Sequence, residues 1–187
     1  MGMFVFPGIL RKVAASDRLR IGHIGLGGMG YNYMKWFAAL TKVEIVALCE
    51  VDQIHLDTTM KTLEMLRPGN KAKAYNDFRH ILDRKDIDMI TCVAPDHWHS
   101  ETANLAFKAG KDVYGEKPLS LDVKGGQDML RNLNRYDRVS QLGSQIHAGD
   151  NYHRVVELIR SGILGNIRTV RLWKTAFPPD LGSAAYQ

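Results

Sequence analysis

Apolar residues along the chain fall in short, nearly continuous runs that alternate with longer amphipathic segments. The short runs predict buried strands over residues 20–25, 43–49 and 87–93, a short strand at 72–75, and further strands at 112–116 and 139–143. The segments between them carry apolar residues at helical spacing and predict helices over 29–40, 52–66, 78–84, 98–108 and 122–134. Strands that alternate with helices through short connections are typical of a doubly wound parallel sheet. We therefore expect an α/β fold over residues 20–142.

Individual positions within these segments carry their own expectations. The apolar helix positions expected to face the core are Tyr31, Met34, Phe37, Leu40, Leu56, Leu63, Leu66, Ala103, Ala106 and Phe107. Cys49 and Cys92 each end an apolar run, which predicts that both are small buried core residues. A short polar side chain at Asn76 or Asp77 is expected to cap the helix that follows, because it can accept from the free amides of the first turn.

The pattern changes after residue 143. The segment 151–161 predicts a helix built on Val155, Val156, Leu158 and Ile159. The segment 167–174 alternates apolar and polar residues, which predicts a strand with one solvated face. One helix and one strand cannot bury each other well, so we expect residues 143–187 to be the beginning of a truncated α+β second domain. Residues 1–19 are expected to form an N-terminal arm.

Composition and charge exclude several classes of protein. The net charge of +5 comes from 25 basic and 20 acidic residues that are scattered along the chain, so no nucleic-acid interface is expected. No apolar run reaches the length of about 18 residues that a membrane helix needs. The apolar start of the chain lacks a preceding basic region, so it does not predict a secretory signal. As the sequence stands, we expect a cytoplasmic protein, although a longer parent protein could be exported.

A glycine-rich loop follows the first predicted strand and opens the first predicted helix. It consists of Gly25, Leu26, Gly27, Gly28, Met29 and Gly30. The G-x-G-x-x-G spacing in this context is typical of a Rossmann-type dinucleotide site. Its glycines permit a tight turn, close approach of a pyrophosphate and close packing of helix on strand. The free amides at the helix start then face the phosphates.

An acidic residue follows the loop at the spacing that dinucleotide-binding proteins use. Glu50 lies twenty residues beyond Gly30, at the end of the second predicted strand. A carboxylate there accepts hydrogen bonds from the adenosine ribose hydroxyls and repels a 2′-phosphate, so we expect NAD as the cofactor rather than NADP. Asp52 is the competing candidate, and either side chain could instead cap the next helix.

Two further motifs lie at the carboxyl ends of later strands, where open parallel sheets bind ligands. Ala94 and Pro95 follow the fourth predicted strand, and His99 is expected to cap the next helix or to line the nicotinamide pocket. His97 and His99 point apart on a helix, so no metal site is expected. The fifth strand ends in Glu116-Lys117-Pro118. A lysine in such a site can exchange protons or stabilise a developing alkoxide.

Taken in order, GLGGMG, CEVD, APDHWH, GEKP, GSQ and ELIRSGILGNIRTV resemble the Gfo/Idh/MocA family, named for glucose–fructose oxidoreductase and inositol dehydrogenase. The resemblance runs from about residue 20 to residue 170. It implies a catalytic or substrate-orienting role for Lys117, and it places the Glu116 backbone near the nicotinamide. It further implies that Glu50 contacts the ribose, that Pro95 and His99 line the cofactor cleft, and that Gln145 lies near the nicotinamide at the domain junction. Nothing after Trp173 matches the acid–base pattern of the family's second domain.

Three functions remain open on this basis. The first is an NAD(P)-dependent oxidoreductase that transfers a hydride between nicotinamide and a sugar, polyol or sugar derivative. The second is an NAD-dependent glycosidase of the same family, and the third is a truncated dinucleotide-binding module without catalysis. The expected partners are a small-molecule substrate and, once the second domain is complete, further copies of the chain in a homo-oligomer. Activity of the 187 residues alone is not expected.

Overall fold

The computed structural model describes residues 18–173, except for the side chains of Gln145 and Ile146. The chain divides into two compact units, residues 1–144 and 145–187, and each is described by itself. The strands of the first unit are β1 (Leu19–Ile24), β2 (Val43–Cys49), β3 (Lys73–Tyr75), β4 (Met89–Cys92), β5 (Asp112–Glu116) and β6 (Ser140–Gly143). They form one sheet in the order β3-β2-β1-β4-β5-β6, and every neighbouring pair is parallel.

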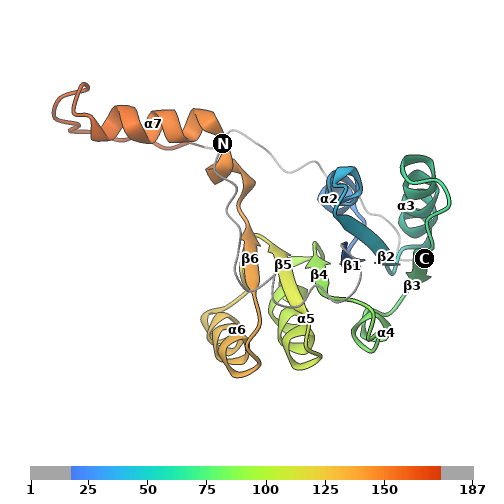
Figure 1. Ribbon diagram of the computed structural model, residues 1–187. Coiled ribbons are helices and arrows are strands. Elements are labelled where there is room, and N and C mark those ends of the chain that lie inside the picture. The colour runs from blue at the N-terminus through green and yellow to red at the C-terminus, as the bar shows by residue number, and fades with distance from the viewer. Residues whose placement is uncertain (1–17, 174–187) are drawn as a thin grey trace, which may run out of the picture. The chain divides into compact units, whose positions relative to one another are not determined.

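Helices cover both faces of this sheet. They are α2 (Gly28–Ala39), α3 (Gln53–Leu66), α4 (Arg79–Leu82), α5 (Asp96–Lys108) and α6 (Val123–Arg135). Figure 1 shows α2 and α3 on one face and α4, α5 and α6 on the other. The strand order reverses between β1 and β4, so the chain winds outward from the centre in two directions. This is the expected doubly wound α/β fold of the Rossmann type.

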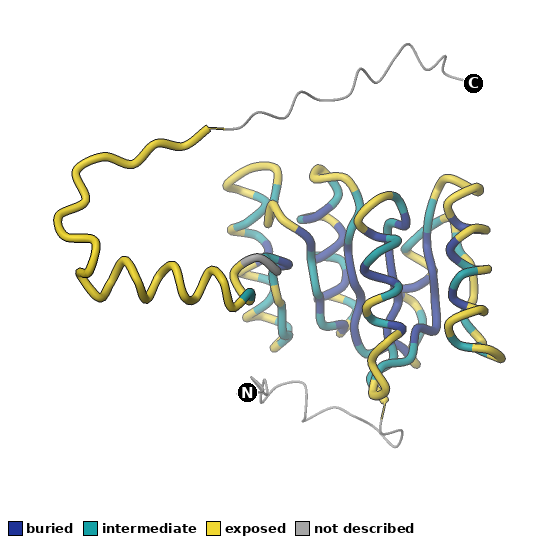
Figure 2. Tube along the Cα trace, turned by 90° about the horizontal axis from the view of Figure 1, so that it is seen from above, coloured by how far each residue is buried: buried dark blue, intermediate teal, exposed yellow. Residues whose placement is uncertain are grey.

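The core lies between the sheet and its two helix layers, where Figure 2 shows the buried strands in dark blue. On the α2 and α3 side, the core residues include Ile21, Met34, Ile45, Leu48, Leu56 and Leu63. On the α5 side they include Ile90, Ala103, Ala106, Phe107 and Val113. Cys49 and Cys92 are buried as expected. Burial raises the pKa of the Cys49 thiol to about 12, so this cysteine stays protonated.

Some helix details differ from the sequence-based expectation. In α2 the buried face consists of Gly30, Tyr33, Met34 and Ala38, whereas Leu40 lies after the helix and is exposed. The helix packs against β2, and the rings of Tyr33 and Phe37 also contact Tyr114 of β5, so its buried face is turned toward that strand. Leu66, the last residue of α3, is exposed as well.

The short helix α4 is capped by one of its two candidates. The Asp77 carboxylate accepts from the backbone N–H of Arg79 at 2.9 Å. The Asn76 side chain instead donates to the backbone carbonyl of Glu50 at 3.0 Å. Asp77 therefore serves the helix, while Asn76 ties the loop after β3 to the end of β2.

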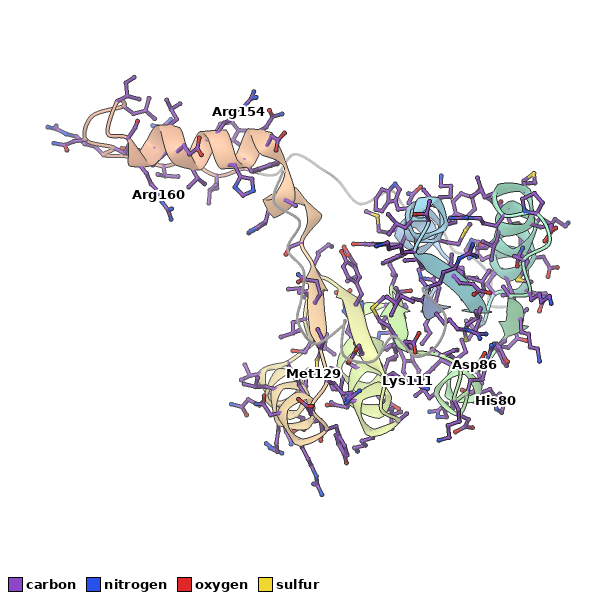
Figure 3. All side chains as sticks on the ribbon, viewed as in Figure 1. His80, Asp86, Lys111, Met129, Arg154 and Arg160 are labelled. Atoms are coloured by element: carbon purple, nitrogen blue, oxygen red, sulfur yellow. The ribbon has the colours of Figure 1, made fainter. Side chains whose placement is uncertain are left out.

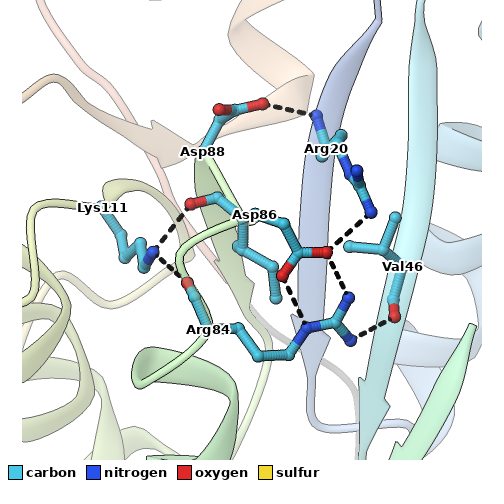
Figure 4. A network of polar contacts seen from close by, with 7 residues as sticks. Arg20, Val46, Arg84, Asp86, Asp88 and Lys111 are labelled. Atoms are coloured by element: carbon cyan, nitrogen blue, oxygen red, sulfur yellow. Dashed lines mark hydrogen bonds and ion pairs between the residues drawn. The ribbon is translucent and has the colours of Figure 1, made fainter. Parts of the chain in front are cut away.

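A polar network holds the strands together at the amino-terminal edge of the sheet (Figure 4). The Asp86 carboxylate accepts from both Arg84 and Arg20, each at 2.7 Å. Arg84 also donates to the backbone carbonyl of Val46 at 2.7 Å. The ammonium of Lys111, which is only 4% exposed, donates to the carbonyls of Arg84 and Ile87. These bonds link β1, β2 and β5 at the edge opposite the glycine loop.

The second unit contains the short 3₁₀ helix η1 (Gln145–Ala148) and the helix α7 (Asp150–Arg160). The helix predicted at 151–161 is thus present, and the side chains of Val155, Val156, Leu158 and Ile159 are exposed. Figure 3 shows Arg154 and Arg160 projecting from α7.

The strand predicted at 167–174 is not formed. Residues 167–173 have no regular secondary structure, and Lys174 lies outside the described residues. A strand requires a neighbour for its backbone N–H and C=O groups, and no strand follows β6 within residues 18–173. The alternating pattern is therefore present without the partner that would make it a strand. Over the same described range, no helix is long and apolar enough to cross a membrane.

Candidate functional site

A cleft of about 600 Å³ opens at the carboxyl ends of β1, β2 and β4. Its walls come from the glycine loop, the end of β2, the loop before α4 and the start of α5. The lining residues are Ile24, Gly25, Gly27, Cys49, Glu50, Val51, Asn76, Asp77, Phe78, Arg79, Val93, Ala94, Pro95, Trp98 and Thr102. The cleft thus lies beside the point where the strand order reverses, which is where open α/β sheets bind their ligands.

The glycine loop packs so tightly that two of its glycines cannot be replaced. Gly25 has a positive φ of 85°, and a Cβ there would lie 2.6 Å from the backbone carbonyl of Val93. A Cβ on Gly30 would lie 2.0 Å from the carbonyl oxygen of Gly25. These contacts press the first turn of α2 against the end of β1 and against β4.

A buried histidine of the sheet is hydrogen-bonded to the first turn of α2. His23 of β1 is fully buried, and its Nε2 lies 2.8 Å from the carbonyl oxygen of Gly30. Its Nδ1 is hydrogen-bonded to the Thr91 hydroxyl of β4. Burial lowers the pKa of His23 to about 4, so the imidazole is neutral at physiological pH. A neutral ring satisfies both bonds when Nε2 donates to Gly30 and Nδ1 accepts from Thr91.

The start of α2 fits the pyrophosphate of a dinucleotide. Gly27 is the N-cap residue and supplies no side-chain cap, and the first turn holds no acidic residue. Around Gly28 the space is open, because a Cβ there would meet no atom within 4 Å. The Gly30 N–H donates to the Gly27 carbonyl at 2.7 Å, so the amides of Gly28 and Met29 are the ones that face this open surface. Such an N-terminus attracts phosphate through its N–H groups and its dipole.

Glu50 and Asp52, the two carboxylates considered for the ribose, are placed differently. Glu50 lines the cleft, and its carboxylate accepts from the N–H of Leu26 at 2.7 Å and from the N–H of Val51 at 2.7 Å. Asp52 is the N-cap of α3 and accepts from Ile54 and His55. These backbone hydrogen bonds, that of His55 first, lower the pKa of Asp52. Glu50 is thus held against the glycine loop, whereas Asp52 serves the helix.

One wall of the cleft was not foreseen from the sequence. It consists of Phe78, Arg79 and Trp98, with the Phe78 and Trp98 rings 6.0 Å apart in an edge-to-face arrangement. Arg79 lies over the Phe78 ring at 5.1 Å. In a parallel sheet the residues that follow β3 lie at the same edge as the glycine loop. The position of the third predicted strand could therefore have indicated that Phe78 and Arg79 lie beside the cleft.

The rim continues past the cleft to the ends of β4 and β5. Ala94 and Pro95, in the loop after β4, still line the cleft, and Pro95 is the N-cap of α5 without a side-chain cap. His99 is 3% exposed; its Nε2 lies 2.8 Å from the Ala94 carbonyl and its Nδ1 2.6 Å from the Pro118 carbonyl. His99 therefore does not cap the helix and is not among the residues that line this cleft, and its place beside the nicotinamide stays a prediction. His99 joins the loop after β4 to the corner after β5.

At that corner the three residues of the E-K-P motif have different surroundings. Glu116, the last residue of β5, is buried and accepts from the Tyr33 hydroxyl at 2.6 Å. Lys117 and Pro118 are exposed and follow it on the rim. The peptide bond between them is cis. The side chain of Gln145 lies outside the described residues, and no group of metal-ligating side chains occurs within the described range.

Comparison with known proteins shows what the chain is similar to. A glycosyl hydrolase family 109 protein from Shewanella pealeana is 27% identical over 158 residues, which are 83% of this chain and 35% of the relative. A scyllo-inositol dehydrogenase from Lactobacillus casei with bound NAD(H) and scyllo-inositol is 27% identical, with a TM-score of 0.70 over 80% of this chain and 43% of that one. The chain thus spans about a third of the length of its curated relatives.

A more distant structure shares the fold alone. It is a 3-ketoreductase from Actinomadura kijaniata in complex with NADP, at 19% identity and a TM-score of 0.72, covering 81% of this chain and 47% of that one. The model of an oxidoreductase family with an NAD-binding Rossmann fold matches residues 19–144. Those residues contain the whole sheet, the glycine loop and the E-K-P corner. The chain therefore belongs to the Gfo/Idh/MocA family of oxidoreductases with an NAD-binding Rossmann fold.

Proposed function

We propose that this chain is the cofactor-binding part of an oxidoreductase that transfers a hydride between nicotinamide and a sugar, polyol or sugar derivative. The observation that carries the proposal is the uncapped start of α2 beside a carboxylate held at its side. Gly27 leaves the first amides of α2 open, and Glu50 lies within 2.7 Å of the Leu26 N–H in the same loop. This combination fits a pyrophosphate next to a ribose.

The preference for NAD follows from the charge of Glu50. The carboxylate accepts from the N–H groups of Leu26, Val51 and Asp52, and its two oxygens offer about four lone pairs, so one remains for a ribose hydroxyl. The 2′-phosphate of NADP would bring a second negative group against it. Arg79 on the opposite wall is paired with Asp77 at 3.3 Å and with Glu101 at 3.6 Å, so its charge is already compensated. We therefore propose NAD as the cofactor.

The proposed catalytic residue is Lys117. It is exposed on the rim, between the anchored residues Glu116 and Pro118. The bound nicotinamide supplies a hydride acceptor at C4. As the carbinol C–H bond breaks and its hydride leaves, the Lys117 amine holds or receives the hydroxyl proton, and the C–O bond becomes a carbonyl. Residues 20–142 would bind the cofactor, and residues 143–187 would belong to a second domain that binds substrate and supports oligomerisation.

A second candidate function is favoured by one comparison. The Shewanella pealeana relative is named as a glycosyl hydrolase. In an NAD-dependent glycosidase the substrate is oxidised and then reduced again within one turnover, so no NADH is released. Offering glycosides with NAD and recording both sugar release and NADH absorbance separates the two functions. Sugar release without NADH favours the glycosidase, and accumulating NADH favours the dehydrogenase.

The first experiment is a calorimetric titration of the purified chain with NAD and with NADP. We expect saturable binding of NAD and weaker binding of NADP; a chain that binds neither contradicts the proposal. The second experiment offers inositols, sugars and glycosides together with NAD. Any turnover found should be abolished by Lys117→Met, while NAD binding stays within about twofold of the unsubstituted chain. Unchanged turnover in that variant would remove Lys117 from the mechanism.

A further inference from the structure

A buried pair of side chains connects the helix of the glycine loop with the E-K-P corner. Tyr33 lies in the second turn of α2 and is 3% exposed, and Glu116 ends β5 and is 7% exposed. The Tyr33 hydroxyl donates to Glu116 Oε2 at 2.6 Å. Burial and the neighbouring carboxylate raise the pKa of Tyr33, so the hydroxyl keeps the proton that it donates. The bond is short, as expected for a charge-assisted contact.

The surroundings are shaped around this pair. Tyr33 packs edge-on against Tyr114, which lies two residues before Glu116 on the same face of β5. From the neighbouring strand, Gly143 leaves room for the two polar groups, because a Cβ there would lie 2.7 Å from both Glu116 Oε2 and the Tyr33 hydroxyl. Glycine at this position thus keeps the space in which tyrosine and glutamate meet.

The pair is costly for the fold. The second carboxylate oxygen, Glu116 Oε1, is buried and has no hydrogen-bond partner within the described part of the chain. A buried carboxylate with one oxygen unpaired destabilises the folded state. An apolar pair would fill the same space without this penalty. The cost indicates that the pair does something other than stabilise the fold.

The position of Tyr33 and Glu116 in the fold indicates which role the pair has. The cleft at β1 and β2 accounts for the adenosine half of a dinucleotide, and the nicotinamide half then extends across the strand reversal toward β4 and β5. Lys117 lies on that side, with a fixed residue before it and another after it. Tyr33 holds Glu116, and His99 holds the carbonyl of Pro118 at 2.6 Å.

We propose that Tyr33 and Glu116 form a positioning pair for the nicotinamide half of the site. The Tyr33 hydroxyl anchors Glu116 and thereby orients the backbone of Glu116 and the amine of Lys117 toward the ring. Tyr33 belongs to α2, whose first turn is proposed to bind the pyrophosphate. The same helix would therefore bind the phosphates and, through Tyr33, position the nicotinamide ring. This inference rests on the proposed function, because it requires a bound nicotinamide dinucleotide.

The test compares two ligands that share the adenosine and pyrophosphate groups. NADH carries the nicotinamide ring and ADP-ribose lacks it. We expect Tyr33→Phe to raise the dissociation constant for NADH about five- to tenfold, the effect of one lost hydrogen bond. The dissociation constant for ADP-ribose should stay within about twofold. The change in NADH fluorescence on binding, which reports the surroundings of the ring, should also be reduced.

A matched control is available in the same helix. Tyr31 also lies in α2, and its hydroxyl is hydrogen-bonded to Thr62 at 3.1 Å, away from the corner. Tyr31→Phe removes an equivalent hydroxyl and should leave both dissociation constants and the fluorescence change unaltered. If Tyr33→Phe behaves like Tyr31→Phe, or if it weakens NADH and ADP-ribose equally, the positioning role is overturned.

Two substitutions of Glu116 test the same hydrogen bond from its acceptor side. Glu116→Gln keeps an oxygen that accepts from Tyr33, whereas Glu116→Ala removes it. We expect Gln to retain NADH binding within about threefold and Ala to lose it as Tyr33→Phe does, with no further loss in the double variant. Equal effects of Gln and Ala would overturn the role of the hydrogen bond. Should the unsubstituted chain bind neither ligand, the proposed function fails instead, and the two failures are distinguishable.

Discussion

The Nε2 atom of His23 lies 2.8 Å from the carbonyl oxygen of Gly30, so a residue of the first strand holds the first turn of the helix that follows the glycine loop. The contact is fully buried, and this burial lowers the pKa of His23 to about 4, so the ring that makes it is neutral at physiological pH. The His23 imidazole, which burial keeps unprotonated, therefore stabilises the loop that would bind a pyrophosphate.

This arrangement predicts a pH dependence of stability. The pKa of His23 is lowered from 6.5 to about 4 by burial. Below pH 6.5 the unfolded chain takes up a proton that the folded chain refuses until about pH 4. The free energy of unfolding therefore falls as the pH is lowered through this window, by up to about 3 kcal/mol from His23. Urea unfolding at pH 7 and pH 4.5 measures the difference.

Two variants test the assignment of that pH dependence to one residue. His23→Gln retains a donor for Gly30 and an acceptor for Thr91 but does not titrate, so the fall in stability between pH 7 and pH 4.5 should shrink. His80→Gln removes an exposed histidine and should leave the fall as it was. A His23→Gln protein with the full pH dependence would show that another group is responsible.

Two glycines of the same loop are expected to fail in different ways. A Cβ at Gly30 would lie 2.0 Å from the Gly25 carbonyl oxygen, so Gly30→Ala should prevent native packing and lower the melting temperature. At Gly27 the backbone is extended, with a φ of −71°, and a Cβ would meet only His55, at 3.9 Å. Gly27→Ala should therefore melt like the unsubstituted chain. It should nevertheless bind NAD at least about tenfold more weakly, because the methyl group occupies the pyrophosphate surface. Thermal melts and calorimetry on both variants separate the two effects, and normal NAD binding by Gly27→Ala would place the phosphates elsewhere.

Glu50 and Asp52, near the end of β2, are also expected to have different roles, one in cofactor preference and the other in stability. Glu50→Ala should reduce the ratio of NADP to NAD dissociation constants about tenfold, because it removes the charge that opposes a 2′-phosphate. Asp52→Ala removes the cap of α3 and should lower the urea midpoint of unfolding while leaving that ratio unchanged. Calorimetry with both cofactors and urea unfolding measure the two quantities. An unaltered ratio in Glu50→Ala would exclude Glu50 from the ribose.

At the opposite edge of the sheet, Lys111 is expected to matter for stability alone. Its ammonium is buried and donates to the carbonyl oxygens of Arg84 and Ile87, and burial lowers its pKa. Lys111→Met fits the same space but leaves both carbonyls without this donor. We expect a loss of about 1–3 kcal/mol in urea unfolding. NAD affinity of the folded variant should be unaltered, and a change in affinity would mean that the two edges are coupled.

The parts of the fold that follow from local pattern were predictable from the sequence. The inner strands β1, β2 and β4 were, because burial on both faces gives parallel strands continuous apolar runs. The edge strands β3 and β6 are short and mostly exposed or half-buried, so their apolar signal is weaker. The glycine loop was predictable, because its spacing reflects its own backbone. The contact between Tyr33 and Glu116 was not, since 83 residues separate them and each looks ordinary in its own segment. The strand expected at 167–174 failed because its formation depends on a neighbour rather than on its own alternation.

The parallel sheet gives every strand one end at the site edge and the other at the edge that holds Lys111, Arg84 and Asp86. The cleft wall formed by the loop before α4 and the buried polar network of Lys111, Arg84 and Asp86 therefore lie at opposite ends of the strands. Mutations at the two ends should then combine almost additively. A library confined to the loop before α4 could alter cofactor choice, while stabilising changes are collected independently at the far edge. The architecture thus separates, within one small sheet, a cleft wall whose side chains can vary from a buried polar network that the fold requires.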